Sequence, residues 1–426
     1  MAELVTKYQQ YAEYKDSGAE RLGEIPSSWQ IVRLKNVLKI RNGRDYKDVE
    51  VDSGGYPVYG SGGIFKRSSS YLYDGKSILF GRKGTVDKPL LVSGRFWTVD
   101  TMFYSEVFDN ALLEYIYYQA LIFPFDLLTT NTALPSMTQE DLLELKLVLP
   151  TMKQQTQIAN FLDFETAQID TLIEKQQTLI KLLKEKRQAV ISHAVTKGVN
   201  PDAPMKGSGV EWLGDVPEHW KQVKLKHVVD YIIDAEHKTA PYFEQGKYLV
   251  CRTTNVRDGE LRLEGGKYTN KETYLEWIKR GKPETGDILF TREAPAGEAC
   301  VYDGEAPLCL GQRMVLFKLK KDRVLPRFIL HSLYSGLADD FIKQLSQGST
   351  VVHFNMADIR NIPLFEPSLE EQQEIIEYLS KLLNKFDDLT YSAEQAIQLM
   401  QERRTALISA AVTGKIDVRG WVVQTL

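Results

Sequence analysis

The chain contains two copies of one framework. Residues 17–37 read SGAERLGEIPSSWQIVRLKNV and residues 208–228 read SGVEWLGDVPEHWKQVKLKHV, with 11 of 21 positions identical. A second repeated motif ends each copy, where a long helical segment closes with ISHAVT at 191–196 and with ISAAVT at 408–413. The residues between these landmarks differ. A duplicated framework with two different inserts predicts two similarly placed domains that do the same job on different targets.

Each insert has the pattern of short strands and turns. Apolar runs separated by Gly and Asp include SILF at 77–80 in the first insert and RMVLFKL at 313–319 in the second. Each insert also carries one helix-like patch, ALLEYIYYQAL from Ala111 and RFILHSLYSGLADDFIKQL from Arg327. The predicted fold class is α+β, with two pseudo-repeated domains.

After each insert the apolar spacing changes from two residues to between three and four, which is typical of amphipathic helices. Steps of four and three residues predict an interface between the helices, or with a partner, at Ile158, Leu162, Ile169, Leu172, Leu179, Leu183, Ile375, Leu379, Leu382, Phe386, Leu389, Met400 and Leu407. The length of this heptad-like pattern predicts two long coiled-coil helices that pack on each other. A pair of ordinary core helices is the alternative.

The landmarks divide the chain into six predicted segments. KGVNPDAPMKGSG at 197–209 is rich in Gly and Pro, which predicts an extended linker. The segments are a first domain at 1–152, a helix at 153–196, the linker at 197–209, a second domain at 210–367, a helix at 368–415 and a tail at 416–426.

Basic residues are concentrated in parts of the two inserts, although the formal net charge of the chain is -4. Residues 31–110 hold 13 Lys and Arg against 9 Asp and Glu, and residues 221–363 hold 22 against 19. Residues 364–415 hold only 5 against 9. Contact with phosphates requires a locally basic face rather than a basic protein, so this distribution permits DNA binding. A mixed, solvated surface would give the same counts.

The sequence favours a soluble protein of the cytoplasm. No apolar run approaches the roughly 20 residues of a membrane helix, and the first residues lack the features of a signal peptide. The three cysteines, Cys251, Cys300 and Cys309, are odd in number and form no Cys-x-x-Cys pair. Neither a disulfide framework nor a zinc site is therefore indicated, and no metal site is predicted.

Common catalytic motifs are missing from the sequence, including the phosphate-binding loop, the zinc-protease helix and the Gly-x-Ser-x-Gly elbow. One pattern imitates a metal-dependent nuclease, because Pro124 and Asp126 precede Glu144 and Lys146 in an acid-x-Lys arrangement. A three-residue match of this kind arises often by chance, and the second insert has no counterpart. An enzyme that acts alone, either a nuclease or a methyltransferase, is therefore the weaker hypothesis, and no catalytic residue is predicted.

The inserts offer residues suited to DNA recognition. Arginine can bind both O6 and N7 of guanine, while Ser, Asn and Gln suit phosphates or adenine edges. The candidate DNA contacts are Ser61, Lys66, Arg67, Arg82 and Lys83 in the first insert and Arg252, Asn255, Arg292, Gln312 and Arg313 in the second. Exposed polar turns without a ligand would have the same composition.

At these residues the chain closely resembles the specificity subunits of type I restriction-modification enzymes. The resemblance covers nearly the whole chain. It is carried by the paired LGEIPSSW and LGDVPEHW motifs, YGSGGI at 59–64, GRKGTVDKP at 81–89, GDILFTREAPAGEA at 286–299, the two helices that begin with paired glutamines, and AVTGKIDVR at 411–419.

The resemblance implies a non-catalytic subunit with two target recognition domains, each reading one half of a split DNA sequence. Two antiparallel helices would separate these domains and dock two methyltransferase subunits, and restriction subunits would join the complex. S-adenosylmethionine, ATP and magnesium are then expected on the partner subunits, and no cofactor on this chain. The transfer of DNA contacts to individual residues rests on loop position alone.

The predicted helices are long enough to set the spacing of two half-sites. A seam from Ile158 to His193 rises on the order of 50 Å, and half-sites one duplex turn apart are separated by about 34 to 36 Å. The remaining alternative is a coiled-coil scaffold that assembles proteins without reading DNA, which the acidic second helix would suit.

Overall fold

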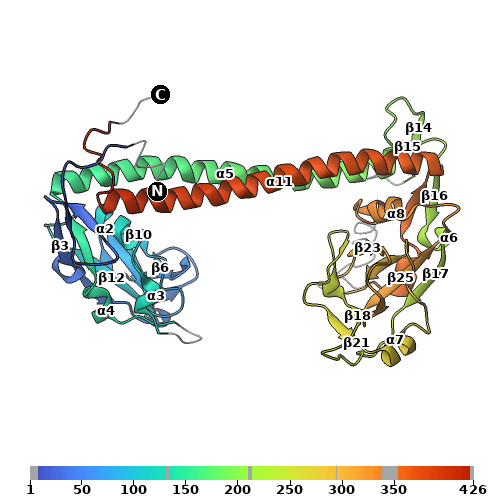
Figure 1. The fold of residues 1–426 in the computed structure, drawn as a ribbon, viewed down its shortest axis with the longest axis horizontal. Helices are drawn as coiled ribbons and strands as arrows, with labels where there is room; N and C mark the ends of the chain where they lie inside the picture. Colours follow the sequence, from blue (N-terminus) through green and yellow to red (C-terminus); the bar gives the residue numbers. More distant parts are fainter. Residues whose placement is uncertain (1–7, 131–134, 210–213, 294, 338–353, 423–426) are drawn as a thin grey trace. The chain divides into compact units, whose positions relative to one another are not determined.

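The chain folds into two compact units, each built from one insert and parts of both long helices. The computed structural model describes residues 8–130, 135–209, 214–293, 295–337 and 354–422. Unit 1 comprises Met1–Gln177 and Glu394–Leu426, and unit 2 comprises Thr178–Ala393 (Figure 1). Each unit therefore joins the beginning of one long helix to the end of the other.

The core of unit 1 contains an antiparallel sheet with the strand order β10-β9-β12-β4. Its strands are β10 (Leu90–Val92), β9 (Ser77–Gly81), β12 (Met102–Val107) and β4 (Leu38–Asn42). A second sheet has the order β5-β7-β6-β11-β8, with β6 and β11 parallel. Its strands are β5 (Glu50–Val51), β7 (Gly63–Ser68), β6 (Tyr56–Gly60), β11 (Arg95–Thr98) and β8 (Tyr73–Asp74).

Unit 2 repeats this topology. Its antiparallel sheet has the order β23-β22-β25-β17, formed by β23 (Ala299–Val301), β22 (Ile288–Thr291), β25 (Met314–Leu319) and β17 (Val229–Asp234). A parallel pair again forms the second sheet, between β18 (Tyr248–Cys251) and β24 (Leu308–Leu310), with β21 (Lys267–Thr269) on the other side of β18. The duplication of the sequence is therefore a duplication of the fold, and the α+β class is confirmed.

Smaller elements complete each unit. In unit 1 they are β1 (Tyr14–Asp16), β2 (Glu24–Pro26), β3 (Gln30–Arg33), η1 (Leu34–Asn36), η2 (Lys47–Val49), α2 (Leu113–Ala120), α3 (Phe125–Leu128), α4 (Gln139–Leu143) and β13 (Lys146–Leu149). In unit 2 they are β14 (Met205–Gly207), β15 (Asp215–Pro217), β16 (Lys221–Lys224), α6 (Leu225–Val228), η3 (Thr253–Asn255), β19 (Val256–Arg257), β20 (Glu260–Leu261), α7 (Lys271–Trp277), α8 (Pro326–Leu333), α10 (Met356–Arg360) and β26 (Pro363–Glu366). β3 pairs with β13 as β16 pairs with β26.

The two long helices are α5 (Met152–Lys197), of 46 residues, and α11 (Leu369–Val412), of 44 residues. Both begin with a reciprocal capping arrangement. Thr151 exchanges hydrogen bonds with Gln154, and Ser368 does so with Glu371. Glycines with positive φ follow both helices, Gly198 at +75° and Gly414 at +73°, where a residue with a Cβ would be strained. Local sequence therefore sets both ends of each helix.

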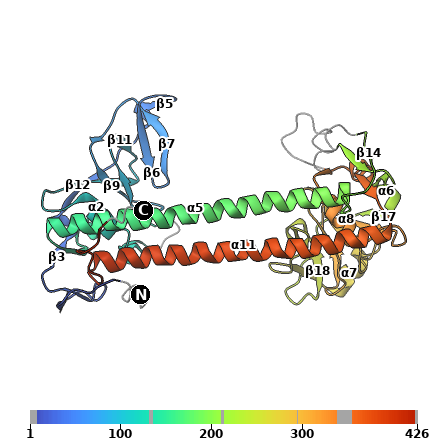
Figure 2. The ribbon, with the colours of Figure 1, turned by 90° about the horizontal axis from the view of Figure 1, so that it is seen from above.

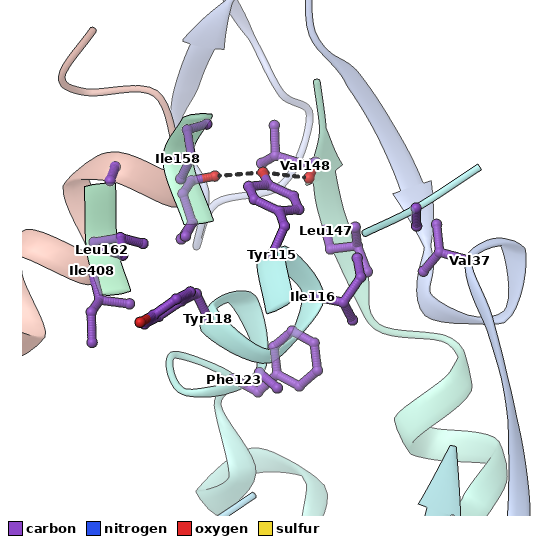
Figure 3. Packing of buried hydrophobic residues seen from close by; sticks show 14 of the residues in the cluster. Val37, Tyr115, Ile116, Tyr118, Phe123, Leu147, Val148, Ile158, Leu162 and Ile408 are labelled. Carbon is purple, nitrogen blue, oxygen red and sulfur yellow. Dashed lines mark hydrogen bonds between the residues drawn. The ribbon is translucent and has the colours of Figure 1, made fainter. Parts of the chain in front are cut away.

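Within each unit, α5 and α11 run side by side (Figures 1 and 2). In unit 1 the antiparallel direction follows from two contacts, because Gln157 reaches Arg419 while Asp170 reaches Arg404. The helix pair packs against α2 and the β3–β13 pair (Figure 3). At the centre of this cluster, the buried Tyr115 hydroxyl donates to Val148 O at 2.9 Å and to Val412 O at 3.2 Å.

Most of the predicted seam residues are buried or half-buried, but three are not. Buried positions are Ile158, Leu162, Ile169, Leu183, Ile375, Leu379, Phe386 and Leu407, while Leu382 and Met400 are half-buried. Leu172, Leu179 and Leu389 are 49 %, 40 % and 42 % exposed, so the structure does not bury them between the helices, and the alternative interface with a partner stays a prediction for them.

Two other segments are more structured than the sequence predicts, and a third is described only in part. The predicted linker at 197–209 contains β14, which pairs with β15. The predicted tail at 416–426 contributes to unit 1, because Asp417 N donates to Gln9 O at 2.7 Å. The second helix-like patch forms α8, and its residues 338–345 lie outside the described part of the chain. Within the described ranges, no helix has the length and apolarity needed to cross a membrane.

Candidate nucleic-acid interface

Arg82 and Arg292 occupy the same place in the two units. Arg82 follows β9, where its backbone N donates to Thr101 O at 2.8 Å and its O accepts from Met137 N at 3.0 Å. Arg292 follows β22, where its N donates to Arg313 O at 2.9 Å and its O accepts from Phe354 N at 3.1 Å. Both arginines therefore lie at the same edge of the repeated four-stranded sheet, the edge formed by the ends of its strands.

In unit 1 this edge contains a polar pocket of about 360 Å³, which we call the Arg82 pocket. Its lining residues are Asn42, Arg82, Lys83, Phe103, Ser136, Met137, Thr138 and Gln139. The Arg82 guanidinium carbon lies 5.9 Å from the centre of the Phe103 ring, and Arg82 Nη1 donates to Asp100 O at 3.4 Å. Gln139 Nε2 donates to Ile40 O at 2.8 Å, which fixes its amide against β4. Basic and amide groups at one concave edge suit the recognition of base edges and phosphates.

In unit 2 the corresponding arginine is held inside the protein. Arg292 Nη1 lies 2.7 Å from Asp234 Oδ2, and Arg292 Nε donates to Phe354 O at 3.1 Å. Only 14 % of the Arg292 side chain is exposed. His237 Nε2 lies 3.3 Å from the same Asp234 oxygen. The geometry thus assigns Arg292 to a contact inside the unit, although the sequence pattern predicts the same role for it as for Arg82.

The other candidates of unit 1 lie on the β6–β7 hairpin. Ser61 is half-buried in its turn, while Lys66 and Arg67 are exposed on β7. Lys66 Nζ pairs with Glu50 Oε1 at 2.5 Å, and this contact raises the pKa of Lys66. Arg67 Nη1 donates to Gly55 O at 3.2 Å. Arg67 therefore remains the more available cation of the hairpin, because its described partner is a neutral carbonyl.

The remaining candidates of unit 2 differ in exposure. Gln312 and Arg313 are exposed in the turn before β25, where Arg313 Nε lies 3.0 Å from Glu293 Oε1. Arg313 has a φ of +74°, a backbone conformation that residues other than glycine adopt rarely. Arg252 is half-buried, and its Nη2 donates to Gly265 O at 3.1 Å.

Asn255 is 1 % exposed and serves the fold of its own turn. Its Oδ1 accepts from Arg252 N at 3.0 Å, and its Nδ2 donates to Arg262 O at 2.9 Å. Both ends of the amide are thus used inside the unit. A DNA contact at Asn255 would leave two backbone groups without partners, so the geometry argues against the contact that the sequence predicts there.

Sequence reasoning missed three residues at this edge, Asn42, Gln139 and Asp234. Asn42 and Gln139 line the Arg82 pocket, and Asp234 holds Arg292. Asn42 ends β4 and Asp234 ends β17, and each of these strands is the first of its four-stranded sheet along the chain. Nothing in the sequence shows that either residue lies near an arginine many positions further on. The only local signal is the place of each at the end of a strand.

The nuclease-like residues do not form a metal site. Glu144 pairs with Arg33 at 2.9 Å and with Lys35, while Lys146 Nζ donates to Gly18 O at 3.2 Å. Asp126 belongs to the short helix α3. In the part of the chain that the structure describes, no group of three or more His, Cys, Asp or Glu side chains could hold a metal ion.

Comparison with known proteins identifies the repeated unit. The family model described as the type I restriction modification DNA specificity domain matches residues 26–182 and again residues 217–399. The chain is 24 % identical over 425 residues to the type I restriction enzyme MjaVIII specificity subunit of Methanocaldococcus jannaschii, covering 93 % of this chain and 94 % of that one. It is 23 % identical to the EcoBI specificity subunit of Escherichia coli, covering 93 % and 88 %.

The fold has also been seen in a solved structure. A chain from a study of complex assembly and conformational transition of the type I R-M system matches with a TM-score of 0.68 and 16 % identity, covering 91 % of this chain and 98 % of that one. The two family matches coincide with the two repeats of strand order. The chain therefore belongs to the family defined by the type I restriction modification DNA specificity domain, of which it carries two copies.

Proposed function

We propose that this chain is the DNA-sequence specificity subunit of a type I restriction-modification complex, in which each unit reads one half of a two-part target. The observation that carries this proposal is the repeat of one sheet topology with different residues at the same edge. Two independent loop sets on one framework suit two unrelated half-sites. The relatives that are named as specificity subunits support this proposal, because the similarity extends over 94 % and 88 % of their chains.

The long helices serve as docking surfaces for two methyltransferase subunits. Leu172, Leu179 and Leu389 are large apolar side chains that stay exposed on them, as a surface for a partner requires. The partners bring S-adenosylmethionine and methylate adenine, and restriction subunits bring ATP and magnesium for cleavage. This chain then directs the chemistry as a non-catalytic subunit and binds none of these cofactors. Because the complex acts on DNA inside the cell, we expect it to work in the cytoplasm.

A map of methylated adenines in the host genome tests the proposal. We expect deletion of the gene to abolish methylation at one two-part sequence and at no other. The map of the intact strain would then give both half-sites and their separation. If the pattern of methylation is unchanged on deletion, while the chain still assembles with its partners, the scaffold hypothesis replaces the recognition hypothesis.

The helices also set the separation of the half-sites. An insertion of seven residues after Gln176 in α5, matched by seven after Ala393 in α11, adds two turns and about 10 Å to the pair. We expect the gap in the methylated sequence to grow by about three base pairs, at 3.4 Å each. An unchanged gap with both half-sites intact would show that the helices do not determine the spacing.

A further inference from the structure

The two units differ in charge at one position, the last residue of the outer strand of the four-stranded sheet. Asn42 ends β4 and pairs with Phe103, the second residue of β12. Asp234 ends β17 and pairs with Val315, the second residue of β25. The two strands have the same place in the repeated sheet, so Asn42 and Asp234 are counterparts. One is neutral and the other carries a negative charge.

This difference determines the state of the arginine that follows the inner strand. In unit 2 the Asp234 carboxylate lies 2.7 Å from Arg292 Nη1 and keeps that side chain largely buried. In unit 1 the counterpart of the carboxylate is an amide, and among the described residues Arg82 has no ion pair. Arg82 and its neighbour Lys83 are exposed instead. The same sheet edge therefore presents a cation in unit 1 and an internal ion pair in unit 2.

The surroundings of Arg82 fit a base edge better than a phosphate alone. The Phe103 ring lies beneath the guanidinium, and the amides of Asn42 and Gln139 line the same pocket. A planar guanidinium that is oriented by an aromatic face can donate two parallel hydrogen bonds to O6 and N7 of guanine. A phosphate contact would need the charge but not the amides or the oriented plane.

We propose that the position of Asn42 and Asp234 selects which unit uses this arginine to read DNA. In unit 1, Arg82 reads a guanine of its half-site from the Arg82 pocket. In unit 2, the ion pair with Asp234 keeps Arg292 away from DNA, so that Arg292 acts as a positioning residue. The exposed turn with Gln312 and Arg313 contacts the bases of that half-site instead. This inference rests on the proposed function and names the base class and the selecting residue within it.

The physical reason is the cost of separating a partly buried ion pair. For Arg292 to reach DNA, it must leave a carboxylate behind, and that carboxylate would face the phosphates without a partner. Arg82 leaves only a backbone carbonyl at 3.4 Å. An acidic residue at position 42 should therefore give Arg82 the internal role of Arg292.

The test uses the chain assembled with its methyltransferase subunits and the two-part sequence found by the methylation map. Competition binding at fixed salt compares target duplexes in which each guanine of a half-site is replaced in turn by 7-deazaguanine, which lacks the N7 acceptor. The variants are Asn42→Asp, Arg82→Ala and both together. Asn110→Asp is the matched control, because it adds the same charge at an exposed position of unit 1 outside the pocket.

We expect the wild-type complex to lose about 5-fold to 150-fold in affinity at one guanine of one half-site. Asn42→Asp and Arg82→Ala should both abolish this discrimination at that guanine only, and the double variant should lose no more than either alone. Asn110→Asp should discriminate as the wild type does. In unit 2, Asp234→Asn should release Arg292 and steepen the salt dependence of binding by about one unit of slope.

Three results would overturn the inference. Arg82→Ala could weaken binding to all sequences equally and reduce the salt slope by about one, as a phosphate contact would. Asn42→Asp could discriminate like the wild type, or no half-site could contain a sensitive guanine. Each of these results keeps sequence-selective binding and so leaves the proposed function standing. Only a wild-type complex that selects no sequence would contradict the proposed function itself.

Discussion

Arg404 of α11 pairs with Asp170 of α5, with Arg404 Nε 2.9 Å from Asp170 Oδ1. Unit 2 contains the same pair with the helices exchanged, because Arg187 of α5 lies 2.6 Å from Asp387 of α11. The shift along the chain that carries Ile158 onto Ile375 also carries Asp170 onto Asp387 and Arg187 onto Arg404. The helix pair thus repeats in both units down to one cross-helix ion pair.

These ion pairs are expected to fix the alignment of the helices rather than to stabilise them strongly. Asp170 is 53 % exposed and Arg404 is 29 % exposed, so water screens their attraction. We expect Arg404→Ala to lower the free energy of unfolding by less than about 1 kcal/mol. Urea unfolding of the variant beside the wild type measures this. A loss of several kcal/mol would mean that the pair is a main source of stability.

The exposed and buried seam leucines of α5 should behave differently. Leu162 is fully buried in the core of unit 1, whereas Leu172 is 49 % exposed on the same helix. Leu162→Ala removes packed methyl groups and should lower the free energy of unfolding by about 2 to 5 kcal/mol. Leu172→Ala should change it little but weaken assembly with a methyltransferase subunit. Equal losses of stability in the two variants would show that the helix contact extends to Leu172.

A buried glutamine ties each long helix to the short helix of its unit. Gln372 Oε1 accepts from Leu325 N at 2.8 Å at the start of α8, and Gln372 Nε2 donates to Arg323 O at 2.9 Å. Gln155 accepts from Leu112 N at 2.7 Å in the same way at the start of α2. Because Gln372 is fully buried, its loss leaves these backbone groups without partners.

We expect Gln372→Ala to lower the free energy of unfolding of unit 2 by about 1 to 3 kcal/mol. Gln373→Ala is the matched control, since Gln373 is its exposed neighbour and contacts only Glu377 among the bonds described. Hydrogen exchange at the amide of Leu325 should quicken in the first variant and not in the second. Similar protection of the Leu325 amide in both variants would show that the Gln372 hydrogen bonds do not hold the start of α8.

Unit 2 should lose stability as the pH falls. Burial, together with the smaller effects of the nearby charges of Arg327 and Arg187, lowers the pKa of His331 from 6.5 to about 4. Between these two pH values the unfolded chain binds a proton that the folded chain does not, so stability is present above pH 6.5 and is lost toward pH 4.

Between pH 7.5 and pH 5 this effect amounts to about 2 kcal/mol of unfolding free energy. His331→Gln removes the titrating group, and its unfolding free energy should fall by correspondingly less over this interval. His193→Gln, at an exposed position of α5, should keep the dependence of the wild type. If His331→Gln and the wild type respond to pH alike in urea unfolding, His331 does not control the stability of unit 2.

The sequence predicts the framework well because its signals are local. The helix predicted at 153–196 is observed at Met152–Lys197, since Thr151 and Gly198 mark its ends within one turn. The second helix ends at Val412 rather than at 415, because Gly414 adopts a positive φ. Short apolar runs bounded by Gly and Asp likewise predict strands such as β9 and β25, whose residues are almost all buried.

The candidate site was harder to predict because tertiary pairing decides it. Arg82 and Arg292 follow similar strands in similar sequence. Only Arg292 forms an ion pair, however, because Asp234 on a strand far away in the sequence packs beside it. Gln139 reaches the Arg82 pocket from α4. Asn255 had a readable local signal, because an asparagine three residues after Arg252 can cap a turn and become buried.

The central claim, that each unit reads one half of the target, is tested most directly by giving both units the same insert. Leu34 N donates to Leu145 O at 2.8 Å and Leu225 N donates to Ile362 O at 2.9 Å, which marks matching exchange boundaries. A chain in which residues 34–145 replace residues 225–362 should direct adenine methylation, read by a genome map, to a symmetric sequence that contains the first half-site twice. Retention of the original asymmetric sequence would contradict the account.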